Sequence, residues 1–204
     1  MGLSAGIAKE REGVSMLKDL VYCCRSYRRF YQEDRIEEGT LRELVDLARM
    51  TPSTANSQAL KFRLVYEEEE CRKLFPCIAW AGALPDWPGP EEGERPSAYI
   101  VICCDLSLGK NKMWDEGIAA QTIMLGAVEK GFGGCMIGSF QRSQAAEVLG
   151  IDTERFSLGL ILALGRPKEE VVVVPVKEDG DGRYYRDEKQ LHYVPKRALE
   201  DIIL

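Results

Sequence analysis

The spacing of apolar residues along the chain predicts several helices. Apolar positions recur at a helical period over residues 14–23, and a second helical pattern begins at Thr40. The Thr40 hydroxyl and Glu43, three positions later, have the arrangement of a capping box. Pro52 is expected to stop this second helix, because proline cannot continue the helical hydrogen bonding.

The longest helix is predicted over residues 115–130, with shorter helices over 67–75 and 143–149. Gly131 follows the long helix as its C-cap. Gly126 lies inside that helix, where glycine costs about 1 kcal/mol relative to alanine. We therefore expect a neighbouring element to pack closely against Gly126.

Short apolar runs bounded by polar residues predict strands over 62–66, 98–104, 135–137 and 158–164. Two more strands, 171–176 and 183–186, flank Asp179-Gly180-Asp181-Gly182 and predict a hairpin, in which Pro175 confines the first strand to a sheet edge. Strands mixed with helices in this order predict an α+β fold with a central sheet.

Composition narrows the class of protein. A chain of 204 residues, 45% hydrophobic and 29% charged, is expected to form one domain over 1–204. With 27 basic against 33 acidic residues the net charge is −6, which disfavours nucleic acid or an anionic membrane as the main partner. No apolar run reaches the roughly 18–20 residues of a membrane span, and residues 9–12 are charged where a signal peptide would be apolar. We expect a soluble, cytoplasmic protein.

The chain is poor in the usual catalytic side chains. It has seven cysteines, an odd number, and a single histidine, His192, so we expect free thiols and neither a disulfide framework nor a metal site. His192 is interpreted as structural, and no Gly-x-Ser-x-Gly motif occurs. An enzyme with this inventory would take its chemistry from a cofactor.

Four segments are candidates for ligand binding. Three arginines within five positions make Arg25-Ser26-Tyr27-Arg28-Arg29 a candidate phosphate cradle, or a solvated helix end. The segment 52–58 could present polar groups to a heterocycle, or form a turn. The glycine-rich segment 131–140 could approach a flat ligand, or be a plain connection. Lys196 and Arg197, on an amphipathic helix expected from about Pro195, form a basic pair that could equally face solvent.

The order of these segments resembles the nitroreductase family of FMN flavoproteins. The resemblance covers residues 19–197 and rests on five motifs in sequence: Arg25-Ser26-x-Arg28-x-Phe30, Pro52-Ser53-x-x-Asn56-x-Gln58, Asp115-x-Gly117-x-Ala119-x-Gln121, the glycines from 131 to 138, and Gly165-x-Pro167. It implies an α+β homodimer with a central, mostly antiparallel sheet flanked by helices, and with two FMN sites at the subunit interface.

The resemblance also implies roles for individual residues. Arg25, Ser26 and Arg28 would bind the FMN phosphate, joined by Lys196 and Arg197. Pro52, Ser53 and Asn56 would lie against the isoalloxazine of the partner's site. Ile137 and Gly138 would lie under the ring, with the Gly138 N–H directed at flavin N5, and no side chain would be an obligate acid or base. Trp87, in the proline-rich loop 85–96, is a candidate for stacking on the substrate.

The reaction implied is ping-pong hydride transfer from NADH or NADPH, through FMN, to a nitroaromatic, quinone or similar small acceptor. Two departures from the family pattern affect the site. Ala59-Leu60 follows Gln58 where proline and an aromatic residue are usual, which concerns the pocket wall, and Cys24 stands where an arginine is common, which concerns the donors to the phosphate. Alternatives are another flavin chemistry on the same fold, such as reductive dehalogenation or flavin cleavage, and a non-catalytic flavin- or anion-binding module.

Overall fold

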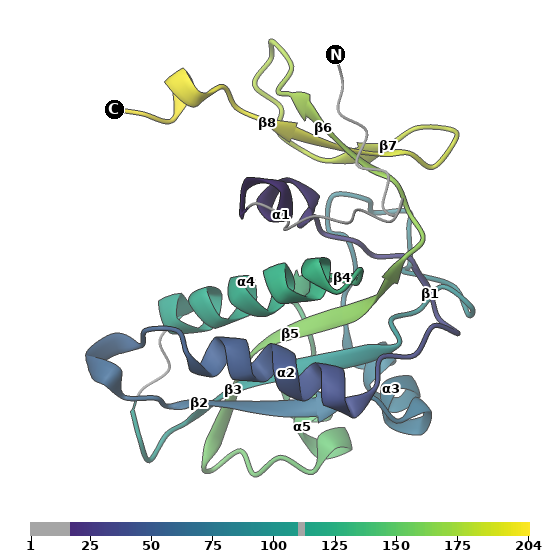
Figure 1. Ribbon diagram of the computed structural model, residues 1–204. Coiled ribbons are helices and arrows are strands. Elements are labelled where there is room, and N and C mark those ends of the chain that lie inside the picture. Colours follow the sequence, from purple (N-terminus) through teal and green to yellow (C-terminus); the bar gives the residue numbers. More distant parts are fainter. Residues whose placement is uncertain (1–16, 110–112) are drawn as a thin grey trace.

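The structure is a computed structural model that describes residues 17–109 and 113–204, and Figure 1 shows a central sheet with helices packed on it. The helices are α1 Leu17–Cys23, α2 Glu38–Arg49, α3 Glu68–Leu74, α4 Met113–Glu129 and α5 Arg142–Leu149, with 3-10 turns η1 Thr54–Asn56, η2 Phe75–Cys77 and η3 Leu199–Asp201. The strands are β1 Phe30–Tyr31, β2 Leu60–Val65, β3 Ala98–Asp105, β4 Gly133–Ile137, β5 Phe156–Pro167, β6 Val171–Pro175, β7 Tyr185–Arg186 and β8 His192–Lys196.

The central sheet has the strand order β1-β5-β3-β2, and β4 also pairs with β5. Every pairing in it is antiparallel. Leu162 of β5 is opposite both Ile100 of β3 and Met136 of β4, so β5 lies between these two strands. The predicted α+β fold with an antiparallel central sheet is confirmed.

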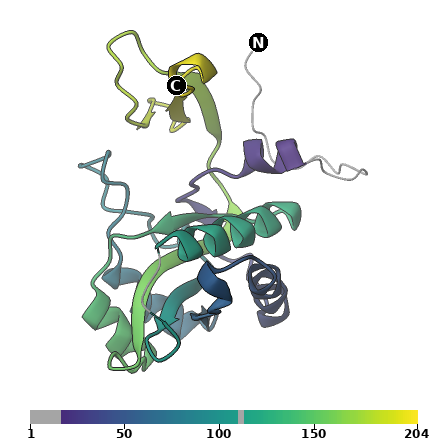
Figure 2. The ribbon, with the colours of Figure 1, turned by 90° about the vertical axis from the view of Figure 1, so that its left-hand side faces the viewer.

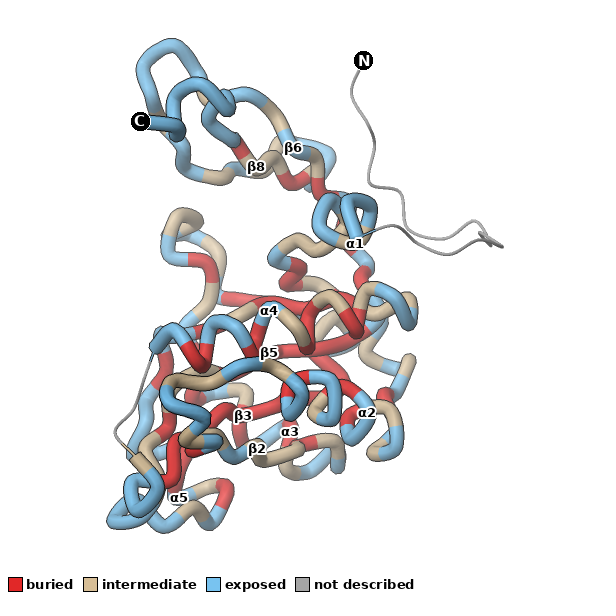
Figure 3. Tube along the Cα trace, turned by 60° about the vertical axis from the view of Figure 1, so that its left-hand side comes forward, coloured by how far each residue is buried: buried red, intermediate tan, exposed pale blue. Residues whose placement is uncertain are grey.

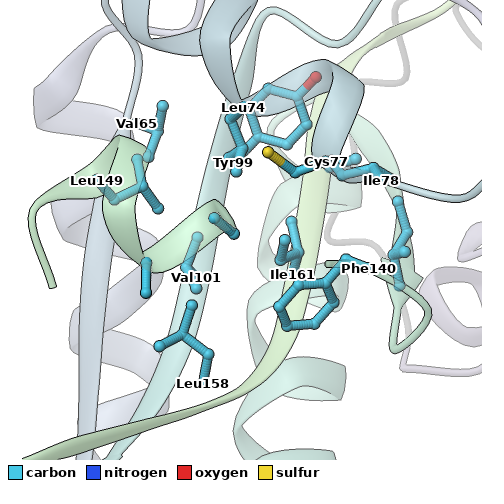
Figure 4. Packing of buried hydrophobic residues seen from close by; sticks show 14 of the residues in the cluster. Val65, Leu74, Cys77, Ile78, Tyr99, Val101, Phe140, Leu149, Leu158 and Ile161 are labelled. Carbon is cyan, nitrogen blue, oxygen red and sulfur yellow. The ribbon is translucent and has the colours of Figure 1, made fainter. Parts of the chain in front are cut away.

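Side chains of β3 alternate between two apolar cores, as expected for a strand buried on both faces. Ile100 and Ile102 pack with residues of α2 and α4 on one face. Tyr99 and Val101 pack with α3 and α5 on the other, where Figure 4 shows them beside Leu149. Figure 3 shows the resulting pattern, in which the strands of the central sheet are buried and the outer turns of the helices are exposed.

The close contact predicted at Gly126 is confirmed. A Cβ added at Gly126 would lie 2.6 Å from Leu47 Cδ1 and 3.0 Å from Leu44 Cδ2, both on α2. Glycine therefore lets α2 and α4 approach closely. Gly131, with φ of +78°, ends the helical segment as expected.

The predicted C-terminal hairpin is wrong. β6 and β7 do not pair with each other, because β8 lies between them: β6 runs parallel to β8 and β7 antiparallel to it. The helix expected from Pro195 is also wrong, since Pro195 and Lys196 belong to β8 and only a 3-10 turn follows. Pro175 does lie on an edge strand, as predicted. Figure 2 shows this small sheet set apart from the central one.

The predicted capping box at Thr40 is wrong, because α2 begins two residues before it. The N-cap is Glu37, which makes no side-chain hydrogen bond. A tertiary contact holds the first turn instead, since the Tyr66 hydroxyl donates to the Glu38 carboxylate at 2.7 Å. Thr40 is therefore an interior residue of the helix.

The cysteines and the helices bear on the cellular setting expected from the sequence. All seven cysteines are free, as predicted. None of the helices within the described residues combines the length and the apolar character needed to cross a bilayer.

Candidate functional site

The basic segment runs beside β4 and is held there by its backbone. Ser26 forms a parallel bridge with Gly134, and the Tyr27 N–H donates to the Gly134 carbonyl at 2.9 Å. Tyr27 and Phe30 are fully buried and anchor the segment in a small apolar cluster. The Ser26 side chain stays exposed.

The arginines of this segment do not form a simple solvated face. Arg28 is only 8% exposed; its guanidinium donates to the Ser26 carbonyl at 3.1 Å and lies 4.6 Å from the ring of Tyr184. Arg25 donates to the Val21 carbonyl at 2.7 Å, and its Nε is buried without a hydrogen-bond partner among the described residues. A buried N–H without an acceptor is costly, so an anion reaching Arg25 would be stabilised.

The segment 52–58 packs against the start of α4. The backbone N–H and the hydroxyl of Thr54 donate to the Asp115 carboxylate at 3.1 and 2.8 Å, and the Trp114 indole donates to the Thr54 hydroxyl at 3.0 Å. Asn56 is exposed and has φ of +51°, in the left-handed region. Ser53 accepts the Gln58 N–H at 3.2 Å, so part of the segment is the turn considered above.

The glycines of segment 131–140 have two kinds of surroundings. Gly133 and Gly134 allow close packing, since a Cβ at Gly134 would lie 2.1 Å from the Ala163 carbonyl oxygen of β5. Gly138 follows the end of β4 and is exposed, with no atom nearer than 3.9 Å to an added Cβ. Its carbonyl accepts from Arg142 at 3.3 Å, a contact that sequence reasoning did not identify.

The predicted site residues fall into separate groups within one chain. Ser26 pairs beside β4, the strand that ends just before Gly138. Pro52, Ser53 and Asn56 lie in the segment attached to the first turn of α4, a helix of 17 residues that is about 25 Å long. Gly134, which Ser26 bridges, lies shortly beyond the other end of that helix, so one chain keeps Ser26 and the 52–56 segment well apart. Figure 1 shows β4 at the opposite end of α4 from the chain that leads into β2.

The remaining predicted residues lie on or against the small sheet. Lys196 is exposed at the end of β8 and Arg197 follows it, also exposed. Trp87 is half-buried, and the Arg186 guanidinium lies 4.2 Å from its ring. Within residues 17–109 and 113–204, no three metal-ligating side chains gather into a cluster.

Glu94 ties the loop 85–96 to the basic segment. Its carboxylate accepts from Arg29 Nη2 at 2.8 Å and lies 3.0 Å from Lys168 Nζ, while its carbonyl accepts the Phe30 N–H at 3.0 Å. The hydrogen bond from Arg29 outweighs the effect of burial and lowers the pKa of Glu94 to about 2.

Glu94→Gln is expected to lower the free energy of unfolding at pH 7 by about 1 kcal/mol, the upper range for a partly exposed ion pair. A carboxyl group whose pKa is lowered by folding stabilises the fold above its ordinary pKa and loses that contribution as pH falls. The difference from wild type should therefore shrink as pH falls from 4.5 to about 2. Urea unfolding in pH steps measures it, and a difference that stays constant over this range would contradict the proposed ion pair.

The chain belongs to the nitroreductase family, whose model matches residues 25–166. A curated relative from Archaeoglobus fulgidus, provisionally named an NADH dehydrogenase/NAD(P)H nitroreductase, is 29% identical over 159 residues, which cover 74% of this chain and 85% of the relative. The matched region contains the basic segment, the 52–58 segment, α4 and β4, and it ends in β5.

Solved structures agree with this family. A protein from Staphylococcus epidermidis, provisionally assigned as an NAD(P)H:FMN oxidoreductase, has a TM-score of 0.69 at 16% identity and covers 98% of this chain and 99% of its own. A nitroreductase from Exiguobacterium sibiricum, also provisionally assigned and solved in complex with FMN, has a TM-score of 0.62 at 18% identity, covering 78% and 91%. An FMN-dependent nitroreductase from Clostridium difficile scores 0.61 at 22% identity, covering 74% and 87%. These likenesses establish the nitroreductase fold.

Proposed function

We propose that this protein is an FMN-dependent oxidoreductase that transfers hydride from NADH or NADPH to a nitroaromatic, a quinone or a similar small acceptor. Membership of the nitroreductase family supports the class of reaction. The observation that carries the assignment of the site is the course of β4, which joins the basic segment at Gly134 to the exposed Gly138. Four residues of extended chain span about 13 Å. FMN has its phosphate at one end and its ring at the other, so the two ends of β4 can each bind one end of the cofactor.

The donor set at the start of this path fits a phosphate. Arg25 has a buried Nε without an acceptor within the described residues, and the neighbouring Ser26 hydroxyl is exposed. Arg28 uses one of its five N–H groups on the Ser26 carbonyl, which leaves others for an anion. We propose that these three residues bind the phosphate and that Lys196 and Arg197 add positive charge.

At the other end of the path, Ile137 and Gly138 are proposed to lie under the ring, with the Gly138 N–H as a donor to it. Arg142 supports this turn through the Gly138 carbonyl. When bound, FMN would supply the hydride chemistry, for which the chain offers no histidine apart from the buried His192. The protein's own contribution is then to hold, orient and shield the reacting groups.

We further propose that the active unit is a homodimer in which the two sheets of each chain form one domain. Exposed large apolar side chains gather on α1, on the first turns of α4 and at the C-terminus, and such patches mark interaction surfaces. They are Leu17, Val21, Tyr22, Met113, Trp114, Ile118, Leu199, Ile202, Ile203 and Leu204. A second copy would cover these groups and bring its Pro52, Ser53 and Asn56 to the site that one chain leaves incomplete.

An anaerobic titration of the purified protein with NADH and NADPH tests this function. The protein is expected to be yellow, to lose its absorbance near 450 nm, as flavins do on two-electron reduction, and to regain it when a quinone or a nitroaromatic compound is added. Size-exclusion chromatography with light scattering gives the oligomeric state in the same preparation.

Three outcomes would contradict the proposal in different ways. Yellow protein that neither nicotinamide bleaches would favour a non-catalytic flavin-binding module. Protein that is colourless and takes up no added FMN would overturn the flavin assignment altogether. Reduction by nicotinamide without any turnover of quinones or nitroaromatics would point to another flavin chemistry on this fold.

A further inference from the structure

Glu169 is a carboxylate buried at the junction of the two sheets. It follows the end of β5, and its side chain has no exposed surface. Removing a carboxylate from water is costly unless charges and hydrogen bonds compensate it. Glu169 has four such partners, and they come from two distant parts of the chain.

Two of the partners are backbone amides of the basic segment. The N–H groups of Arg28 and Arg29 both donate to Oε1 of Glu169, the second at 3.2 Å. These contacts fix the backbone immediately after Ser26. The basic segment is thus held on one side by Gly134 of β4 and on the other by Glu169.

The other two partners come from the small sheet. Arg186 of β7 donates from Nη2 to Oε2 of Glu169 at 2.9 Å, and the Nδ1 of His192, in β8, lies 3.4 Å from the same oxygen. Both side chains are almost fully buried. Arg186 supplies a positive charge to the carboxylate that the two backbone amides share, and His192 helps to enclose it.

Aromatic contacts complete the enclosure. Tyr184 lies between Arg28 and His192, with its ring 4.6 Å from the guanidinium and 5.3 Å from the imidazole. Trp87, from the loop 85–96, covers the outer face of Arg186 at 4.2 Å. The cluster therefore joins the basic segment, this loop and the small sheet through one buried charge.

The electrostatics of the cluster keep Glu169 ionised. Burial alone would raise the pKa of this carboxyl group, but the contact with His192, the Arg28 amide and the charge of Arg186 together lower it below the ordinary value. An ionised oxygen is a stronger acceptor for backbone N–H groups than a neutral amide oxygen. The charge on Glu169 therefore strengthens its hold on Arg28 and Arg29.

We propose that Glu169 is a positioning residue that fixes the basic segment for an anionic ligand, and that the small sheet supports it through Arg186 and His192. This role rests on the proposed function for the identity of the ligand, since the phosphate of FMN is the anion expected there. The holding of the segment itself does not depend on any ligand. The two statements can therefore be tested separately.

Amide hydrogen exchange of the protein without added flavin tests the holding of the segment. In Glu169→Gln, peptides covering residues 25–30 are expected to exchange at least tenfold faster than in wild type. Peptides from α4, residues 113–129, should exchange at the wild-type rate. Glu178→Gln removes a carboxylate from an exposed position between β6 and β7 and should leave both regions unchanged.

Unchanged exchange over residues 25–30 in Glu169→Gln would overturn the proposal. If that variant does not fold, Glu169→Asp replaces it, because it keeps the charge but shortens the side chain by one methylene. It should also accelerate exchange over residues 25–30, and wild-type exchange there would overturn the proposal equally.

Binding of FMN and riboflavin, followed by flavin fluorescence, tests the link to the anion. Riboflavin lacks the phosphate, so a displaced basic segment should affect it little. Glu169→Gln is expected to raise the Kd for FMN at least tenfold and that for riboflavin less than twofold. Glu178→Gln, the exposed control variant, should bind both flavins like wild type.

A general loss of packing would raise both dissociation constants together, and that result would overturn the positioning role toward phosphate. Wild-type protein that binds neither flavin would instead contradict the proposed function. In that case the exchange experiment alone would still decide whether Glu169 holds the segment.

Discussion

Replacing Gly134 with alanine is expected to lower the free energy of unfolding by about 4 kcal/mol or more, at the upper end of single-residue effects. The added Cβ would lie 2.1 Å from the Ala163 carbonyl oxygen and 2.9 Å from Leu164 Cδ2. Neither β4 nor β5 can move aside easily, because they pair along five residues and the basic segment is bonded to Gly134 on the other side of β4. Urea unfolding followed by circular dichroism measures the loss.

Gly138→Ala is the matched control in the same segment. Its Cβ would meet no atom nearer than 3.9 Å, and its φ does not require glycine. It should change the free energy of unfolding by less than about 0.5 kcal/mol. Gly134→Ala with wild-type stability would show that Gly134 does not lie against the Ala163 carbonyl.

The contrast between these two glycines shows that the sequence pattern alone does not predict the role of each glycine. The sequence pattern of the glycine-rich segment predicts either a close approach to a flat ligand or a plain connection. Gly134 instead serves strand packing, while Gly138 is exposed and has space around it. Composition cannot separate these roles, because they depend on which strand lies opposite each glycine.

Elements whose signal is local were predicted well. The pattern over residues 115–130 predicts α4 to within two residues, and the run 98–104 predicts β3. Both predictions succeed because the periodicity and the apolar character of one continuous element depend on consecutive residues. The start of α2 was misplaced because Tyr66, distant in sequence, binds Glu38. A capping motif is a local preference that a tertiary contact can override.

Errors concentrate in the C-terminal region, where pairing is not local. The turn sequence at 179–182 predicts that 171–176 and 183–186 pair directly, yet β8 lies between those strands. The segment from Pro195 was expected to be helical, but its residues complete β8. The strand at Pro195 becomes evident only from the pairing of β8 with β6, and a short turn motif does not determine strand order.

The candidate site is predicted only in part, because some of its contacts join residues that are distant in sequence. The segments that contain Arg25, Asn56 and Gly138 were selected by their own sequences. Nothing in the local sequence marks Glu169, because it lies 141 and 140 positions away from the Arg28 and Arg29 amides that it binds. His192 was interpreted as structural, and it is buried beside Glu169.

Arg28→Ala is expected to weaken FMN binding about tenfold or more, since a hydrogen bond to a charged group contributes about 1.5–3 kcal/mol. Arg28 is held by its amide on Glu169 and by its ring contact with Tyr184, so its guanidinium is fixed before any ligand arrives. A fixed donor loses little conformational entropy on binding. Flavin content after dialysis and a fluorescence titration with FMN measure the effect.

Two comparisons separate loss of the phosphate contact from loss of structure. Arg183→Ala removes an exposed arginine that is paired with Asp181 in the region between β6 and β7, and it should bind FMN like wild type. Riboflavin affinity of Arg28→Ala should fall much less than FMN affinity, because only FMN has the phosphate. If Arg28→Ala kept its full complement of FMN after dialysis, Arg28 would not be a phosphate ligand, and the cradle would have to be built from Arg25, Ser26 and the C-terminal basic pair.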